Sequence, residues 1–150
     1  MSANRYNLER FLTAQEQDYA QALKEIRSGR KRSHWMWYIF PQLKDLGYSS
    51  AAKYYGIQDL DEAEAYLGNP TLRERLIEIS EALLFLKNND AESIMGYPDN
   101  LKLQSSMTLF AAADPEEPVF AYVLNKFFNN EADERTLDLL CHYENRKNRT

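Results

Sequence analysis

The sequence is poor in the residues on which several common kinds of protein depend. It has one cysteine, Cys141, so an intrachain disulfide and a cysteine-rich metal site are excluded. It has five glycines, and no segment shows the alternation and turn pairs of strands. No apolar run approaches the roughly 20 residues that span a bilayer, and the first residues lack a signal peptide's apolar core. We therefore expect a cytoplasmic chain without a membrane partner.

Motifs of well-marked chemistries are also missing. The sequence contains no Gly-rich phosphate loop, no nucleophile elbow and no zinc-binding helix motif. Cys141 and His142 are neighbours without further ligands at metal spacing, which favours a structural role for both. We expect no cofactor and no metal ion.

What is present suits one globular unit. The chain of 150 residues has 44% apolar and 13% aromatic residues, enough for a core, and no internal segment has the composition of a linker. We expect a single domain over residues 1–150, with residues 1–5 and 144–150 frayed at its ends.

Helical periodicity and capping residues predict an all-α fold, a single compact multi-helix bundle. Thr13 and Glu16 have the spacing of a capping box, and Gly29 can end the helix that they begin. Asp99 can cap a helix over residues 100–113. The other expected helices cover residues 49–55, 59–68 and 70–87, and two more follow Pro118 and Asp133.

Charge is unevenly distributed along the chain. The net charge is -5, which argues against broad nucleic-acid binding, yet the segment Lys24–Arg32 holds five basic residues and one acid. This local surplus suits a phosphate or carboxylate ligand, or else consists of solvated side chains at a helix end.

The segment His34–Gln42 places two tryptophans, a tyrosine and a phenylalanine directly after basic residues. If Ser33 caps a short helix there, its free N–H groups form an anion site with Lys31, Arg32 and His34, beside flat aromatic surface. The alternative is that both tryptophans belong to the core. His34 is a candidate acid or base, or a hydrogen-bonded support for the segment.

A second segment carries polar residues on an otherwise apolar helix. Lys102, Ser105 and Ser106 fall at positions i, i+3 and i+4 and share one face. A lysine at such a position needs a partner. That partner is either a protein carboxylate or an anionic ligand that the two hydroxyl groups also contact.

At these residues the sequence resembles the DUF1810 family, a domain of unknown function. The resemblance rests on Arg10-Phe11, Asp61-Glu62-Ala63, Pro98-Asp99 and the runs Gly29–Trp37, Phe40–Gln42 and Ser105–Phe110. It implies a compact all-helical domain and no particular activity. Members sometimes carry the label calpastatin, but a compact, aromatic-rich chain is unlike a disordered protease inhibitor.

The leading hypothesis is that the two segments meet and bind a phosphate-bearing small molecule, such as a nucleotide or an ADP-ribose-like compound. The ligand-binding residues would be Lys31, Arg32, Trp35, Trp37, Gln42, Lys102, Ser105 and Ser106, and His34 would be the catalytic residue of any hydrolase or transferase reaction. One alternative is a protein-interaction module in which Trp35, Trp37 and Tyr38 form an exposed patch. A third is a single-stranded nucleic-acid binder, which the acidity of the chain makes the least favoured.

Overall fold

In the computed structural model, which describes residues 5–148, all regular secondary structure is helical. An isolated parallel bridge joins Leu43 to Ile57, and no strand occurs in this range. The predicted all-α fold is confirmed. The helices are α2 (Glu9–Arg27), α3 (Met36–Ile39), the 3-10 helix η1 (Lys44–Leu46), α4 (Ser50–Tyr55), α5 (Leu60–Gly68), α6 (Pro70–Phe85), α7 (Ala91–Met95), α8 (Asp99–Ala113), α9 (Val119–Phe128) and α10 (Glu134–Asn148).

Several helices begin at the capping residues that the sequence indicates. Ser49 accepts a hydrogen bond from the amide of Ala52, and Asp59 accepts one from the amide of Glu62. Asn69 accepts two amide bonds ahead of α6, where proline occupies the first helical position. These side chains satisfy amides that a helix leaves without a backbone partner, so local sequence fixes these starts.

The expected start of the first long helix at Thr13 is wrong. α2 already begins at Glu9, and Phe11 in its first turn is fully buried. Burial of that ring stabilises the earlier turn more than a capping box on the exposed side chain of Thr13 would. Gly29 ends the helix as expected, with a φ of 87° that a residue with a side chain rarely adopts. Asp99 is the first residue of α8 and not its cap, because Pro98 precedes the helix.

The helix α10 continues into the segment expected to be frayed and ends at Asn148. The hydroxyl of Tyr143 donates to Asp45 at 2.5 Å, and Lys147 donates to Asp61 at 2.7 Å. These bonds tie the second half of α10 to η1 and α5. Residues 1–4 and 149–150 of the predicted frayed ends lie outside the described residues.

A chain of aromatic rings joins the helices through the core. Tyr66 of α5 lies 5.1 Å from both Phe11 of α2 and Phe110 of α8, measured between ring centroids. Phe110 in turn lies 5.9 Å from Phe120 of α9. All four side chains are fully buried, so the core connects four helices from both halves of the chain.

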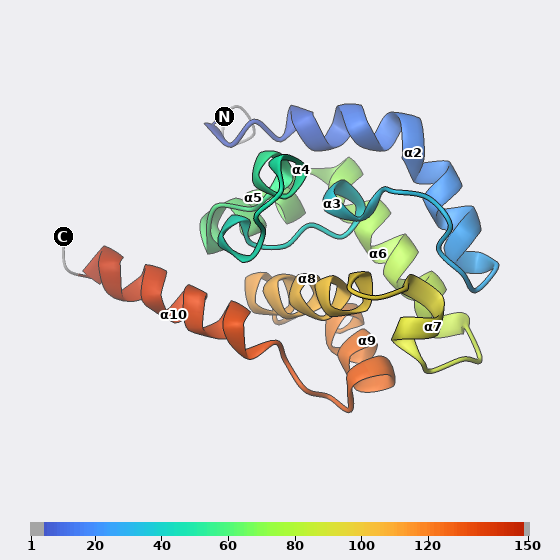
Figure 1. Ribbon diagram of the computed structural model, residues 1–150. Helices are drawn as coiled ribbons and strands as arrows, with labels where there is room; N and C mark the ends of the chain where they lie inside the picture. Colours follow the sequence, from blue (N-terminus) through green and yellow to red (C-terminus); the bar gives the residue numbers. More distant parts are fainter. Residues whose placement is uncertain (1–4, 149–150) are drawn as a thin grey trace.

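The arrangement of the helices brings the two unusual segments close together, with Lys102 of the second beside Trp37 of the first. Figure 1 shows α2 along the top, α8 across the middle, α3 between them, and α10 projecting to the left. Gln15 of α2 holds α3 in place, because its amide donates to the carbonyl of Tyr38 at 2.8 Å. No helix in residues 5–148 has the length and apolar character needed to cross a membrane.

Candidate functional site

The anion position predicted at Ser33 is occupied by a side chain of the protein. One carboxylate oxygen of Glu25 accepts hydrogen bonds from the amides of Arg32 and Ser33, at 2.8 and 3.0 Å, and from the indole N–H of Trp35, at 2.9 Å. The other oxygen accepts from the hydroxyl of Ser33 at 2.6 Å and from the amide of Gln21 at 2.9 Å. Five donors therefore surround one internal carboxylate.

These hydrogen bonds keep the carboxyl group of Glu25 ionised. Its side chain is 3% exposed, and burial alone raises the pKa of a carboxyl group because it disfavours the charged form. Hydrogen bonds from Ser33, Arg32, Gln21 and Trp35 outweigh burial and lower the pKa of Glu25 to about 2. The carboxylate therefore stays ionised throughout the physiological range.

Ser33 does not cap a helix, so that expectation is wrong. The short helix α3 begins at Met36, its N-cap is Trp35, and no side chain caps it. The chain reverses after α2, and the segment that follows closes onto Glu25 instead of forming a helical turn at Ser33. The N–H groups expected to bind an external anion are thereby already satisfied.

The three rings of the hypothetical interaction patch, those of Trp35, Trp37 and Tyr38, do not form an exposed patch. Trp35 is 1% exposed and Tyr38 is 8% exposed, and Trp37 is half-buried. Trp35 occupies the core position that the sequence left open as the alternative. Trp37 is thus the tryptophan of the pair whose ring is accessible.

Lys31 lies against the same aromatic segment. Its ammonium group is 2.9 Å from a carboxylate oxygen of Asp99, donates to the carbonyl of Ser33 at 2.5 Å, and lies 4.9 Å from the centroid of the Trp35 ring. The side chain is 7% exposed. The ion pair, the hydrogen bond and the contact with an aromatic face together compensate for the burial of the charge of Lys31.

Lys102 brings the second segment to the first. Its ammonium group lies 3.5 Å from the other oxygen of Asp99 and 5.7 Å from the centroid of the Trp37 ring. Its side chain is 28% exposed. Asp99 is thus the protein carboxylate that partners Lys102, and it is shared with Lys31. Among the described residues no other carboxylate lies within ion-pair distance of either lysine, so this cluster carries one excess positive charge.

A small cavity opens beside Lys102. Its volume is about 10 Å³, roughly that of one water molecule. The side-chain amide of Gln42 and the indole N–H of Trp37 have no hydrogen-bond partner within residues 5–148. Both groups are therefore available to a ligand. The cavity is lined by Met36, Trp37, Phe40, Gln42, Ala52, Gly56 and Lys102.

The two serines of α8 lie elsewhere. The hydroxyl of Ser105 is 3.1 Å from Asp133 and 3.1 Å from the carbonyl of Leu101. Ser106 is fully buried, and its hydroxyl has no partner in the part of the chain that the structure describes. Neither serine lines the cavity at Lys102.

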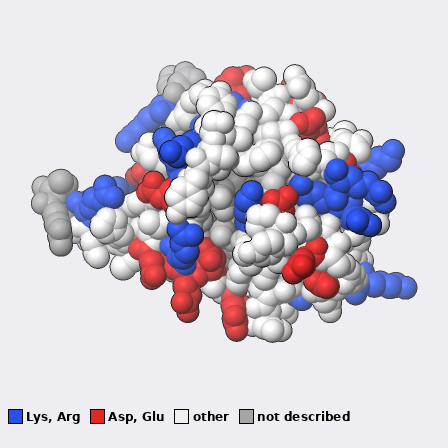
Figure 2. All heavy atoms as spheres, in the orientation of Figure 1, with Lys and Arg blue, Asp and Glu red and all other residues white. Residues whose placement is uncertain are grey.

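Arg32 and His34 are exposed, and their side chains make no hydrogen bond or ion pair among residues 5–148. Figure 2 shows Lys and Arg side chains gathered over the end of α2 and the loop that follows it. The exposed basic residues of this stretch are Lys24, Arg27, Arg30 and Arg32. The surface around the loop is therefore positively charged on an acidic protein.

Sequence reasoning missed Glu25 and Asp99, the two carboxylates that organise this region. Glu25 is the one acid in the basic segment, and it follows Ala22 by one helical turn on the buried face of α2. An acid on a buried helix face needs hydrogen-bond donors, so its position was a signal for an internal anion. Nothing in the local sequence indicates that Asp99 binds Lys31.

No group of three or more His, Cys, Asp and Glu side chains within residues 5–148 is placed to hold a metal ion. Cys141 is exposed and has a free thiol.

Comparison with known proteins gives the family and a structural relative. No curated protein matches the chain. A crystal structure of the conserved hypothetical protein Rv1873 from Mycobacterium tuberculosis is similar, with 44% identity and a TM-score of 0.90 over 91% of this chain and 98% of that one. The model of DUF1810, a protein family of unknown function, matches residues 5–140. The chain therefore belongs to the DUF1810 family.

Proposed function

We propose that the protein binds a small phosphate-bearing molecule, of the nucleotide or ADP-ribose-like kind, where Trp37, Gln42 and Lys102 meet. The observation that carries this proposal is the sharing of Asp99 by two lysines. One carboxylate neutralises one ammonium group, so the cluster keeps a positive charge beside a half-buried aromatic ring. A phosphate group would complete the charge balance.

Each group near the cavity has a definite contribution. Lys102 is the more accessible of the two lysines and would contact the phosphate directly. Lys31 is buried and would act through its charge alone. The ring of Trp37 offers a face for a nucleobase, and the amide of Gln42 offers both a donor and an acceptor.

The size of the cavity limits how a ligand can lie. A volume of about 10 Å³ admits little more than one oxygen atom of a phosphate group. The body of the ligand would therefore lie over the surface outside the cavity, and the proposal assigns it contacts with the exposed side chains of Arg32 and His34. His34 remains the candidate acid or base if a reaction takes place there. In their present positions Trp35, Ser105 and Ser106 would support the fold and not touch the ligand.

The proposal includes a cytoplasmic location and excludes a nucleic-acid partner. A reducing compartment keeps an exposed free thiol such as that of Cys141 unpaired. The net charge of -5 favours a compact anion at one basic spot over a long polyanion.

A thermal-shift screen of nucleotides and phosphorylated metabolites tests the proposal, because a ligand that binds only the folded state raises the melting temperature. We expect at least one compound to stabilise the protein and Lys102→Ala to remove that stabilisation. Lys87→Ala is the matched control, because it deletes an exposed lysine outside the cavity. Equal stabilisation of Lys102→Ala and the parent protein, or no stabilising compound at all, would exclude this site.

Asp99→Asn gives a second variant with the opposite expected effect. It removes the carboxylate that competes with a phosphate group for both lysines. The variant itself should be less stable, because Lys31 loses its buried partner. The shift that the phosphate compound produces, measured from the variant's own melting temperature, should be larger than in the parent protein. A smaller shift would contradict the role given to the excess charge.

A further inference from the structure

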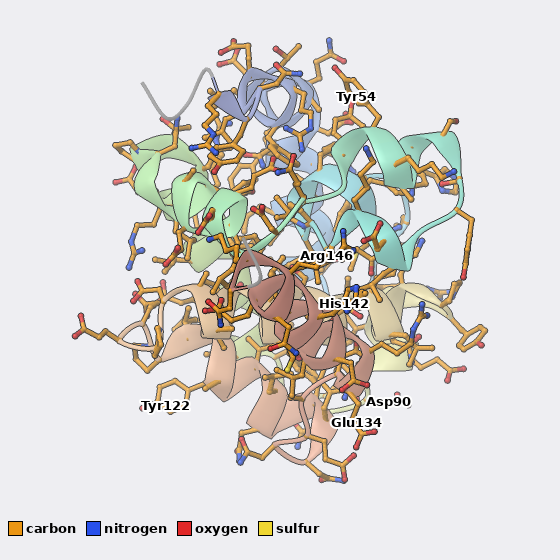
Figure 3. The ribbon with its side chains drawn as sticks, turned by 90° about the vertical axis from the view of Figure 1, so that its left-hand side faces the viewer. Tyr54, Asp90, Tyr122, Glu134, His142 and Arg146 are labelled. Atoms are coloured by element: carbon orange, nitrogen blue, oxygen red, sulfur yellow. The ribbon has the colours of Figure 1, made fainter. Side chains whose placement is uncertain are left out.

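A second cavity lies between α2 and α4, and Tyr38 of α3 is part of its lining. Its volume is about 420 Å³, which is in the range of small-molecule sites. Figure 3 shows Tyr54 at the outer surface beside α2. The cavity is lined by Asn7, Glu9, Arg10, Thr13, Ala14, Gln17, Asp18, Tyr38, Tyr54 and Tyr55, and it shares no residue with the cavity at Lys102.

Arg10 lines this cavity but has no capacity left for a ligand. Its guanidinium group donates to the carbonyls of Tyr6, Asn7, Tyr54 and Gly56 and to the carboxylate of Glu62. These five acceptors match the five N–H donors of a guanidinium group. The ion pair with Glu62, at 2.8 Å, balances its charge. Arg10 is therefore structural and does not attract an anion to the cavity.

Two carboxylates of the lining lack a cationic partner. Neither Glu9 nor Asp18 forms an ion pair among the described residues. The hydroxyl of Tyr38 donates to one oxygen of Asp18, and the other oxygen accepts no hydrogen bond from residues 5–148. Burial and the bond to Asp18 raise the pKa of Tyr38, so the phenol keeps its proton and adds no charge. With Arg10 balanced, the cavity carries an excess negative charge.

Aromatic rings form the walls next to these carboxylates. The rings of Tyr54 and Tyr55 are 4.8 Å apart and nearly perpendicular, with an angle of 80° between their planes. Tyr38 lies 5.0 Å from Tyr55 at an angle of 58°. The three tyrosines thus line one cavity with rings that are tilted relative to one another. Tyr54 is 57% exposed, so a ligand can reach the cavity from solvent.

We propose that this cavity binds a small organic cation through a tertiary or quaternary ammonium group, with Tyr38, Tyr54 and Tyr55 as aromatic walls and Asp18 as the counter-charge. Aromatic faces attract ammonium groups, and alkylated ones suit such walls because they carry apolar surface as well as charge. The carboxylates disfavour a phosphate ligand here. A neutral sugar would leave the charge of Asp18 without a partner, so a cation is the better match.

Titration with choline chloride, followed by amide NMR spectra of the intact protein, tests this inference. Sodium chloride at equal ionic strength is the first control. The neutral analogue of choline, in which carbon replaces the nitrogen atom, is the second. We expect saturable changes at residues of α2 and α4 with choline and at least about tenfold weaker binding of the neutral analogue, which corresponds to about 1.4 kcal/mol. Equal binding of the two compounds, or no saturable change with choline, would refute the proposal.

Two variants then locate the site. Asp18→Asn keeps an acceptor for the hydroxyl of Tyr38 but removes the charge, and it should weaken choline binding by about tenfold. Tyr54→Ala removes an exposed ring and should weaken it about threefold. Glu16→Gln is the matched control, because Glu16 is an exposed carboxylate of α2 that does not line the cavity. Unchanged affinity in both Asp18→Asn and Tyr54→Ala would place choline elsewhere.

A peptide that carries trimethyllysine distinguishes the two sources of the same ammonium chemistry. Tighter binding of choline than of the peptide is the result expected for a free small molecule. Tighter binding of the peptide would overturn that assignment and identify a side chain of another protein as the ligand. Neither result depends on the phosphate site, because the two cavities share no residue.

Discussion

Replacement of Glu25 by glutamine should lower both the stability of the fold and the dependence of that stability on pH. Glutamine keeps the size of the side chain but loses the charge. Its NH₂ group is a donor and cannot accept the hydrogen bonds that a carboxylate oxygen of Glu25 accepts. The pKa of Glu25 is about 2, against 4.5 for an ordinary glutamate. A difference of about 2.5 pKa units corresponds to about 3 kcal/mol in the free energy of unfolding at neutral pH. We expect Glu25→Gln to lose about that amount.

The sign of the pH effect follows from the direction of the pKa shift. Between the folded-state pKa of about 2 and the ordinary value of 4.5, the unfolded chain binds a proton that the native protein does not. The contribution of Glu25 is therefore complete above the ordinary value and is lost as the pH falls toward the folded-state value. At about pH 3, roughly 2 kcal/mol of it is gone. Glu25→Gln cannot show this loss, because glutamine does not titrate.

Urea unfolding at neutral pH and at about pH 3, followed by tryptophan fluorescence, measures both quantities. Other carboxylates also titrate, so the relevant number is the pH-dependent loss in the parent protein minus that in Glu25→Gln, expected to be about 2 kcal/mol. Glu81→Gln, at an exposed position on α6, should show the parent protein's loss. If Glu25→Gln loses as much stability on acidification as the parent protein, the five hydrogen bonds do not hold the carboxylate in its charged form.

Three further substitutions test other parts of the fold by urea unfolding. Arg10→Ala leaves the buried carboxylate of Glu62 unpaired and should cost about 3–5 kcal/mol, whereas a loss below about 1 kcal/mol would contradict a buried ion pair. Ser106→Ala removes a buried hydroxyl that has no partner among residues 5–148 and should change stability by less than about 1 kcal/mol, so a larger loss would reveal a hydrogen bond. Gly56→Ala would place its Cβ 2.4 Å from the Cα of Lys44 and should cost about 1–3 kcal/mol, and an unchanged stability would show that this backbone yields.

The helices α4, α5 and α6 could be predicted because local sequence determines where each of them starts. Ser49, Asp59 and Asn69 each bind amides within their own first turn, so the sequence around them contains the needed information. The helix α7 was missed, although Asp90 caps it in the same way, because five residues are too few for a periodic pattern. Local signals also failed at Thr13, where the burial of Phe11 extends the helix.

The candidate site could be predicted only in part. The position of Lys102 on an otherwise apolar helix predicted that it needs a partner, and the sequence also shows that the aromatic run follows basic residues directly. Neither observation identifies the carboxylates that lie nearby in the folded protein. Glu25 meets Ser33 only because the chain turns at Gly29, and Asp99 meets Lys31 across 68 positions of sequence. Partners of this kind depend on tertiary packing, on which neither periodicity nor composition reports.

The difference between the two carboxylates determines where the proposed anion would bind. Glu25 is surrounded by five donors and occupies the place of an anion at Ser33, so that position is closed to a ligand. Asp99 offers one charge to two lysines, and the second, Lys102, lies at 3.5 Å and stays partly exposed. Attraction for an anion is strongest where the protein's positive charges outnumber the negative charges that pair with them and where the ligand can displace water. Within the basic-aromatic region that condition holds beside Trp37 and not at Ser33. Lys102→Ala should therefore weaken the binding of a phosphate ligand, and Ser33→Ala should leave it unchanged.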